Sequence, residues 1–596
     1  MYAQVVVLTY QPPEIDSYTY KIPKNLEKEV KVGQLVEVPF GKRTPLGIVI
    51  QASQKDSPLQ RRLLSKKIKP ITDIIMATPI LLTYQIELLK WMSAYYIAPM
   101  VNCLKIMLPA LPGKLPKAFS YSSSDPALRE SREVSLVNGK FSTSSNSKQS
   151  QTLVLVPSIT RIPEAMSNFP KAKNYAIYHN ELKPTEKFTT FARILNGGVD
   201  YIFGSRSAIF APCPNFKKII IYNEHETTYK DERSPYYDTL TIAEKIAQIT
   251  KVEIKIVDPA PKITTYFNWQ KNISINSQNT KFKIISLEKE RLGGNYSPLA
   301  LDTEEFIKRV VKSKKNALLY INKKKESGYL FCKSCKNKQF LETQVDICPN
   351  CQSSDIFLNS LNVYSLAQTV KKIVYHYPVN VIEQKQKSYP SQNSIDIATS
   401  FVFYSQPLKK YELVIFTFAD SITQVADWKT EEKLYQTIIK LKSLLSQNGL
   451  LVIQTYNPQN QTIFWAARGD YKSFYNTQIN NRKLLSYPPF ALLIKLTLKG
   501  KNKEKVESEA NRLITQLQSI TQPASPTRLN SARRAIQLLG PYASIFFPKI
   551  PTFNIIIKYK LNSYKLAERE KAIKDLKPIL KDLKNVQVTV EPEFLN

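Results

Sequence analysis

From Gln151 onward, short apolar runs alternate with stretches of helical periodicity, and this alternation restricts the fold more than any other feature of the sequence. The apolar runs include 153–157 (LVLVP), 218–222 (KIIIY) and 316–321 (NALLYI). Short strands that alternate with helices are typical of a parallel sheet with helices packed on it. The pattern therefore predicts two α/β lobes, at 151–270 and 280–462.

The rest of the chain predicts further modules, because 596 residues should divide into about four domains of ordinary size. Residues 1–112 begin with strand-like alternation broken by Gly and Pro, which predicts a β-barrel-like module. Residues 113–150 are rich in Ser, Lys and Asn without periodicity, as in a linker. We expect 463–596 to form an α+β C-terminal domain, so the fold class is a multidomain α/β protein.

The net charge points to a polyanionic partner. It is +35, from 84 Lys and Arg against 49 Asp and Glu, and this exceeds what solubility requires. Charge alone does not distinguish DNA, RNA and acidic membrane, and general lysine enrichment of the surface is an alternative explanation. Since the sequence shows neither a secretory leader nor a long apolar run, we expect a cytoplasmic protein without a membrane partner.

Four of the six cysteines form two Cys-x-x-Cys pairs, Cys332 with Cys335 and Cys348 with Cys351. Each pair can direct two thiolates at one ion, and four thiolates complete a closed tetrahedral site. A redox disulfide is the alternative, but a redox motif would not recur at this spacing. The spacing therefore predicts one structural Zn²⁺ in an insert at 331–352.

Residues 204–212 (GSRSAIFAP) and 218–230 (KIIIYNEHETTYK) have the layout of a nucleotide-driven motor without its catalytic residues. In such a motor, a buried strand ends in Asp-Glu-x-His, with one carboxylate for Mg²⁺ and one for the attacking water. Tyr222 and Asn223 occupy those two positions here, and Glu224 and His225 follow them. We expect the strand to persist as a frame, with Glu224, His225 and Arg206 as polar struts and no catalytic residue.

Glycine is scarce, with 15 residues in 596, and a phosphate-binding loop needs glycines. The nearest candidate, 138–142 (NGKFS), lacks the first glycine and has Phe where a hydroxyl should bind Mg²⁺. A plain turn in the linker is the simpler interpretation. The sequence therefore predicts that ATP is not a cofactor.

Taken in order, the blocks at 153–157, 204–210 and 222–230 resemble the PriA (primosomal protein N′) family of replication-restart proteins, which are superfamily 2 helicases. The resemblance implies two RecA-like lobes, degenerate here, and a zinc-ribbon insert with one ion where the family holds two. The family's winged helix and phosphate loop would lie in 113–150, which is too short for both. Leu441 and Leu444 stand where the resemblance expects arginines that reach the γ-phosphate.

The same resemblance implies a pocket for the 3′ end of a DNA strand within 1–112. The matching positions are Tyr18, Gly41, Lys42 and Lys69, together with Thr19 where the family has Asp. An aromatic ring can stack on a terminal base, glycine admits a close backbone, and lysine binds phosphate. The alternative is that Tyr18 is an ordinary strand aromatic and Gly41 a turn residue, and Thr19 leaves 3′-end selectivity open.

We therefore expect a PriA-like protein of replication restart that binds forked or 3′-ended DNA and scaffolds primosome assembly without helicase activity. Single-strand-binding protein and other primosome proteins are its expected partners. Two alternatives stay open. One is an ATP-dependent 3′-to-5′ DNA helicase with an unrecognised site, and the other is a zinc-containing RNA-binding protein.

Overall fold

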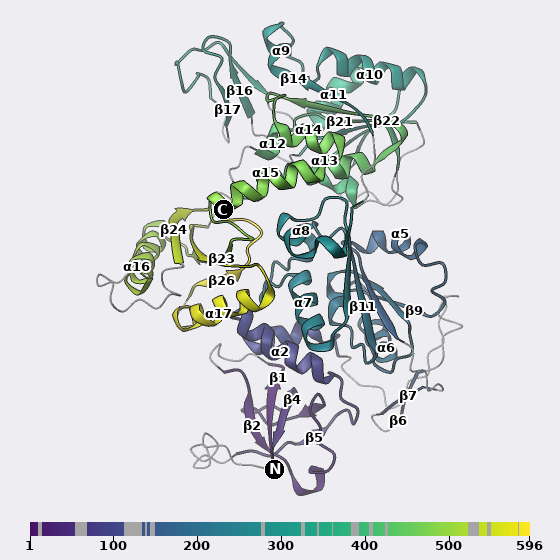
Figure 1. Cartoon of the computed structure of the whole chain (residues 1–596), viewed down its shortest axis with the longest axis vertical. Coiled ribbons are helices and arrows are strands. Elements are labelled where there is room, and N and C mark those ends of the chain that lie inside the picture. The colour runs from purple at the N-terminus through teal and green to yellow at the C-terminus, as the bar shows by residue number, and fades with distance from the viewer. Residues whose placement is uncertain are drawn as a thin grey trace. The chain divides into compact units, whose positions relative to one another are not determined.

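A computed structural model describes most of the chain (Figure 1), namely residues 1–9, 15–53, 68–111, 134–137, 140–143, 150–275, 280–322, 328–341, 345–359, 362–382, 393–404, 409–423, 427–521, 536–544, 550–581, 583 and 585–595. These residues group into two compact units. The first comprises Met1–Asp258, Thr264–Ser274 and Arg482–Asn596, and the second comprises Pro259–Ile263 and Ile275–Asn481. Among the described residues, no helix is both long and apolar enough to cross a membrane.

The first unit begins with a β-barrel-like module of antiparallel strands in the order β2-β1-β4-β3-β5. A bridge between Lys21 of β2 and Pro70, just before β5, joins the two edge strands. Alternate residues such as Val5, Val36 and Val49 fill the interior. The elements are β1 (Tyr2–Val7), β2 (Tyr18–Lys21), β3 (Leu35–Glu37), β4 (Leu46–Ser53), β5 (Asp73–Ile74), α2 (Thr83–Tyr95) and α3 (Met100–Met107).

The first lobe is a six-stranded parallel sheet in the order β13-β12-β11-β8-β10-β9, as the alternation of strands and helices predicts. Its strands are β8 (Gln151–Leu155), β9 (Tyr175–Tyr178), β10 (Tyr201–Gly204), β11 (Phe216–Tyr222), β12 (Glu253–Val257) and β13 (Ile273–Ser274). Its helices are α5 (Ile162–Ser167), α6 (Pro184–Leu195), α7 (Thr239–Thr250) and α8 (Ile263–Trp269). Helices α6 and α7 pack on one face, and α5 packs on the other.

The second unit holds the other parallel sheet, in the order β14-β22-β21-β15-β20-β19. Its strands are β14 (Lys281–Ser286), β15 (Ala317–Tyr320), β19 (Val379–Ile382), β20 (Ile395–Ala398), β21 (Tyr411–Phe416) and β22 (Leu445–Thr455). The larger helices are α9 (Leu287–Leu292), α10 (Leu301–Lys312), α11 (Val363–Ile373), α13 (Thr430–Ser443), α14 (Gln461–Arg468) and α15 (Tyr471–Leu484). An antiparallel insert, β17-β16-β18, is formed by β16 (Gly328–Cys332), β17 (Lys338–Leu341) and β18 (Ile356–Asn359).

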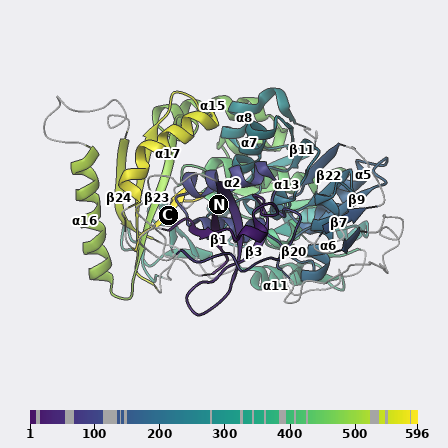
Figure 2. The same cartoon turned by 90° about the horizontal axis from the view of Figure 1, so that it is seen from below.

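The chain closes with an α+β module whose antiparallel strands follow the order β24-β25-β23-β26. Helix α16 lies along this sheet (Figures 1 and 2). The elements are β23 (Ala491–Lys499), α16 (Lys503–Thr521), β24 (Ile536–Ala543), β25 (Thr552–Lys560), α17 (Leu566–Leu580) and β26 (Gln587–Val590).

The expected linker, 113–150, lies mostly outside the described residues. Within it the structure describes a two-stranded hairpin of β6 (Val134–Val137) and β7 (Lys140–Thr143). Asn138 and Gly139, from the weak phosphate-loop candidate, also lie outside the described residues.

Candidate metal centre and nucleic-acid interface

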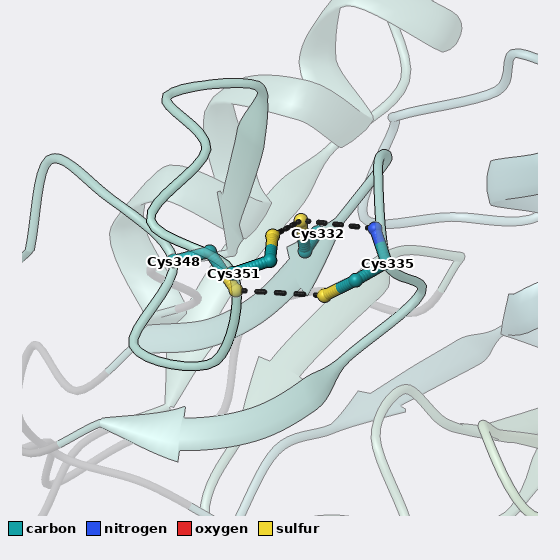
Figure 3. Close-up of side chains that lie close together, drawn as sticks. All are labelled: Cys332, Cys335, Cys348 and Cys351. Atoms are coloured by element: carbon teal, nitrogen blue, oxygen red, sulfur yellow. Dashed lines mark hydrogen bonds between the residues drawn. The ribbon is translucent and has the colours of Figure 1, made fainter.

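Four cysteine thiols meet in the insert of the second unit (Figure 3). Their sulfur atoms all lie within 4.8 Å of one another. The Sγ atoms of Cys332 and Cys351 are 3.6 Å apart, and those of Cys335 and Cys348 are 3.7 Å apart. The four residues that the spacing predicts as one ligand set therefore lie together and could hold one metal ion.

Both Cys-x-x-Cys pairs turn in the same way. The amide of each first cysteine donates to the carbonyl five residues further on, at 2.9 Å from Cys332 to Asn337 and 2.8 Å from Cys348 to Ser353. The residue after each second cysteine has a left-handed φ of 59°. Each pair is thus a tight knuckle that brings its two thiols to the same side.

A hydrogen bond favours the ionised form of one thiol. The side-chain amide of Asn350 donates to Sγ of Cys335 at 3.6 Å, and this bond is the main cause that lowers the pKa of Cys335 to about 6. The thiolate is the form of cysteine that binds metal ions. The local structure therefore suits a metal ligand.

Aromatic contacts attach this insert to the second lobe. Phe331, which directly precedes Cys332, is buried in an apolar cluster with side chains of the lobe. The guanidinium of Arg291 on α9 lies over two rings, 5.1 Å from the centroid of Phe357 and 6.0 Å from that of Tyr456. Phe331 therefore links the first cysteine knuckle directly to the packing of the lobe.

Tyr18 lies beside a tight turn of the β-barrel-like module. Its ring meets the ring of Phe40 edge-on, with 5.1 Å between centroids. Phe40 and Arg43 exchange two backbone hydrogen bonds, of 2.8 and 3.1 Å, so that Gly41 and Lys42 form the exposed tip of the turn. Gly41 has a φ of +61°, which glycine adopts without strain. Three of the predicted DNA-binding residues, Tyr18, Gly41 and Lys42, thus lie close together.

Thr19 and Lys69 occupy other parts of the module. Neighbouring strand residues point to opposite faces, so the side chain of Thr19 points away from that of Tyr18. Lys69 is exposed, and its carbonyl accepts from the amide of Lys21 at 3.0 Å, at the far end of β2. Lys21 is itself exposed, and the sequence motif did not single it out. The segment at Lys69 and Pro70 pairs with the edge of β2 and so brings Lys69 next to Lys21. The local sequence did not predict this pairing.

In the first lobe, hydrogen bonds to the backbone of Tyr222 and Asn223 hold the turn after β11. The amide of Asn223, which has a left-handed φ of 49°, donates to the carbonyl of Val257 at 2.9 Å. The hydroxyl of Tyr229 donates to the carbonyl of Tyr222 at 2.8 Å. Glu224, the next residue, is buried. The positions that would carry hydrolysis in a motor, Tyr222 and Asn223, therefore lie half-buried in a hydrogen-bonded turn.

His225 is bound to Asp258, a residue to which the sequence interpretation gave no role. Its Nδ1 lies 2.7 Å from Oδ1 of Asp258, and its amide donates to Oδ2 at 2.8 Å. Strands β11 and β12 are parallel neighbours in register up to Tyr222 and Val257, so the residues that follow them meet. The shared edge of adjacent parallel strands is the signal that could have found this pair.

Two further predicted positions serve as structural groups. Arg206 donates to the carbonyls of Thr228 and Lys230, at 2.8 and 2.6 Å, and so braces the turn after β11. Leu441 and Leu444 are 0% and 1% exposed, so they are core residues of the second lobe. The places where arginines would reach a nucleotide are thus filled by apolar packing.

Comparison with known proteins identifies the family of the N-terminal module. Residues 6–109 match the family profile of the 3′ DNA-binding domain (3′BD) of PriA. The chain is 23% identical over 496 residues to the replication restart protein PriA of Bacillus subtilis, which covers 74% of this chain and 60% of that protein. It is 22% identical over 573 residues to PriA of Rickettsia felis, which covers 83% of this chain and 87% of that protein. The chain is a divergent relative of PriA.

The similarity to PriA has clear limits. This chain spans about three-fifths of the length of the Bacillus subtilis PriA. Among solved structures, the helicase Lhr of Mycobacterium smegmatis bound to ssDNA and AMP-PNP covers 55% of this chain and 43% of its own, at 10% identity and a TM-score of 0.31. That structural likeness is too remote to support an argument. The PriA match is best localised in the module that carries Tyr18, Gly41 and Lys42.

Proposed function

We propose that this PriA relative binds forked or 3′-ended DNA in replication restart and scaffolds primosome assembly without ATP-driven unwinding. The observation that carries the proposal is the match of residues 6–109 to the 3′BD, in a module where Tyr18 lies beside the exposed Gly41–Lys42 turn. A ring there can stack on a base, and the lysine can bind a phosphate. The net charge of +35 favours such a polyanionic partner. Single-strand-binding protein and other primosome proteins are the candidate protein partners.

The DNA-binding proposal predicts different effects for two variants. Tyr18→Ala should weaken binding to a fork with a free 3′ end by about 1–3 kcal/mol, because a stacking ring is lost. It should bind a fork with a 3′-phosphate about as well as the parent chain does. Lys42→Ala should weaken binding to both forks and reduce the log–log salt slope by about one unit. Fluorescence anisotropy over a salt series measures both effects.

The matched control is Lys105→Ala, which removes an exposed lysine from α3 of the same module. Equal affinity of the parent chain for the two forks, or equal behaviour of Tyr18→Ala and Lys105→Ala, would refute a 3′-end pocket at Tyr18. A structured RNA of equal charge is the competitor that tests the RNA-binding alternative. Preference for that RNA over both forks would favour the alternative.

We propose that the cysteine cluster holds one Zn²⁺. A tetrahedral site with Zn–S bonds of about 2.3 Å has sulfur–sulfur edges of about 3.8 Å. The distances of 3.6 Å between Cys332 and Cys351 and 3.7 Å between Cys335 and Cys348 fit those edges. Both are far longer than the roughly 2.05 Å of a disulfide, so these thiols are free to act as ligands. Four protein thiolates leave no ligand position for water, so the role of the ion is structural.

The absence of ATP-driven unwinding is proposed from three features of the lobes. Tyr222 and Asn223 stand where a motor has its two carboxylates, and backbone groups of both residues are held by hydrogen bonds. Leu441 and Leu444 are core residues where arginines would stabilise the transition state. A single arginine finger is worth about 10³-fold or more in turnover, so these losses together should abolish catalysis.

We therefore expect no DNA-stimulated ATP hydrolysis by the full chain in a coupled assay with forked DNA. Tyr222→Asp combined with Asn223→Glu restores both carboxylates and should stay inactive, because the sequence still lacks a phosphate loop. Turnover that co-purifies with the chain and disappears in Glu224→Gln would refute this expectation. That result would favour the alternative function, an ATP-dependent 3′-to-5′ helicase.

A further inference from the structure

The two faces of the first lobe's sheet are covered very differently (Figure 1). On one face, helices α6 and α7 bury an apolar layer that includes Ile219, Ile221 and Ile256. On the other face, the described cover consists of α5 and the segment that follows it, including Phe169 and Ala172. Parallel sheets usually carry helices over both faces. Among the residues that the structure describes, α5 is the helix that packs on this second face, and the rest of the face carries no described helix.

This second face is hollowed and combines aromatic with basic side chains. The hollow has a volume of about 370 Å³. Its lining includes Phe169, Tyr201, Tyr222, Lys218, Lys255 and Asn168. We call Phe169, Tyr201, Tyr222, Lys218 and Lys255 the α5-face platform. Each of its three aromatic side chains is only half-buried, and Lys255 is exposed.

The strand register sets the spacing between the lysines and the aromatic side chains of the platform. Lys255 of β12 pairs with Ile220, two residues beyond Lys218 of β11. A rise of about 3.3 Å per residue and a strand spacing of about 4.8 Å place the two lysine backbones roughly 8 Å apart. Tyr201 of β10 lies two strands from Lys218, on the other side of β8. An aromatic group thus flanks the lysine pair.

The charge around the platform is positive. Two acidic residues beside it are paired, Glu253 with Lys218 at 3.1 Å and Glu164 with Arg161 at 2.7 Å. Exposed lysines also lie on the segment next to Phe169. The basic side chains on and beside the platform are Arg161, Lys171, Lys173, Lys218 and Lys255. These five basic residues outnumber the two acidic ones, so the surface has a net positive charge. Such a surface attracts a phosphate backbone.

We propose that the α5-face platform binds single-stranded nucleic acid. A β-sheet surface with aromatic rings can stack bases without reading their sequence, and flanking lysines can bind the phosphates between them. Tyr201 is the stacking residue, and Lys255 is the phosphate-binding residue. This site is separate from the 3′-end pocket proposed above, because none of its residues belongs to the β-barrel-like module. Because it needs no 3′ end, the platform can bind a circular single strand.

The test uses the full chain and a fluorescent circular oligo-dT, which offers no 3′ end to the other pocket. Lys255→Glu should weaken this binding at least about 5-fold and reduce the salt slope by one or two units. Tyr201→Leu keeps an apolar side chain but loses the ring, and should weaken binding about 5-fold with the salt slope unchanged. A circular oligo-rU of equal length shows whether DNA or RNA binds more tightly.

Lys183→Glu is the matched control, with the same charge reversal at an exposed lysine next to α6, on the opposite face of the sheet. Thermal unfolding of each variant shows whether the fold is retained. The proposal is overturned if the parent chain binds neither circle, or if Lys255→Glu and Lys183→Glu bind alike. If Tyr18→Ala still reduces fork binding while Lys255→Glu has no effect on circles, the 3′-end function survives and the platform does not.

Discussion

Replacing Cys348 by Ser should reduce the bound metal from one ion per chain to almost none. Cys348 is buried, and its sulfur lies 3.7 Å from that of Cys335. The insert has a small core of its own, so we expect metal binding to add to its packing on the lobe as a main source of its folding energy. Structural zinc sites contribute about 10–16 kcal/mol in small peptides at neutral pH. Metal analysis after chelator-free purification measures the change directly.

Loss of the ion should also expose the insert to protease. Lys333 and Lys336 lie within the first knuckle, where trypsin should cut the Cys348→Ser chain but not the parent. Cys213→Ala is the control, because Cys213 is buried in the first unit and lies outside the cluster. This control should retain one ion. A parent chain without metal, or a Cys348→Ser chain with unchanged metal, would contradict the proposed site.

The cysteine cluster could be predicted from sequence because its information is local. Each Cys-x-x-Cys pair forms one knuckle through backbone bonds a few residues long, such as that from Cys332 to Asn337. The two parallel sheets were predictable for a similar reason, since a run such as 218–222 has strand character by itself. The order of the strands was not predictable, because pairing depends on contacts between distant segments.

The contacts that the sequence did not predict depend on pairing between distant segments. His225 meets Asp258 only because β11 and β12 are neighbours. Thr19 and Tyr18 are adjacent in sequence, yet strand geometry separates their side chains. Tyr201 and Lys255 come from strands 54 residues apart and share one hollow. A sequence motif identifies residues that are close along the chain. The residues of the platform come together only because distant strands pair in one sheet.

The first unit also contains a charge network around a buried arginine, and the sequence did not predict it. Arg569 of α17 is 2% exposed. Its Nη1 donates to Glu591 at 2.6 Å and to Thr241 at 3.1 Å, and its Nη2 donates to Glu244 of α7. The indole of Trp269 also donates to Glu244, at 2.9 Å. One buried arginine therefore compensates two partly buried carboxylates and joins the C-terminal module to the first lobe.

Arg569→Met should lower the free energy of unfolding around α7 and α17 by about 3–5 kcal/mol. The methionine fills much of the space, but it leaves the partly buried carboxylates of Glu244 and Glu591 without their cation. Hydrogen exchange measured at these two helices resolves the effect from unfolding of the second unit. Adding Glu244→Gln and Glu591→Gln to Arg569→Met should recover most of the loss, because a fully neutral site has no unpaired charge.

The loss in Arg569→Met should also depend on pH. Burial already raises the pKa of Glu244, and Arg569 opposes that rise. Without the arginine, the folded state binds a proton more tightly than the unfolded chain, so its stability increases as pH falls through the raised pKa. The deficit should therefore be larger at about pH 8 than at about pH 5. Arg161→Met is the control, since its partner Glu164 is largely exposed and such pairs contribute about 0–1 kcal/mol. Equal and pH-independent effects of the two variants would show that the buried network does not hold the modules together.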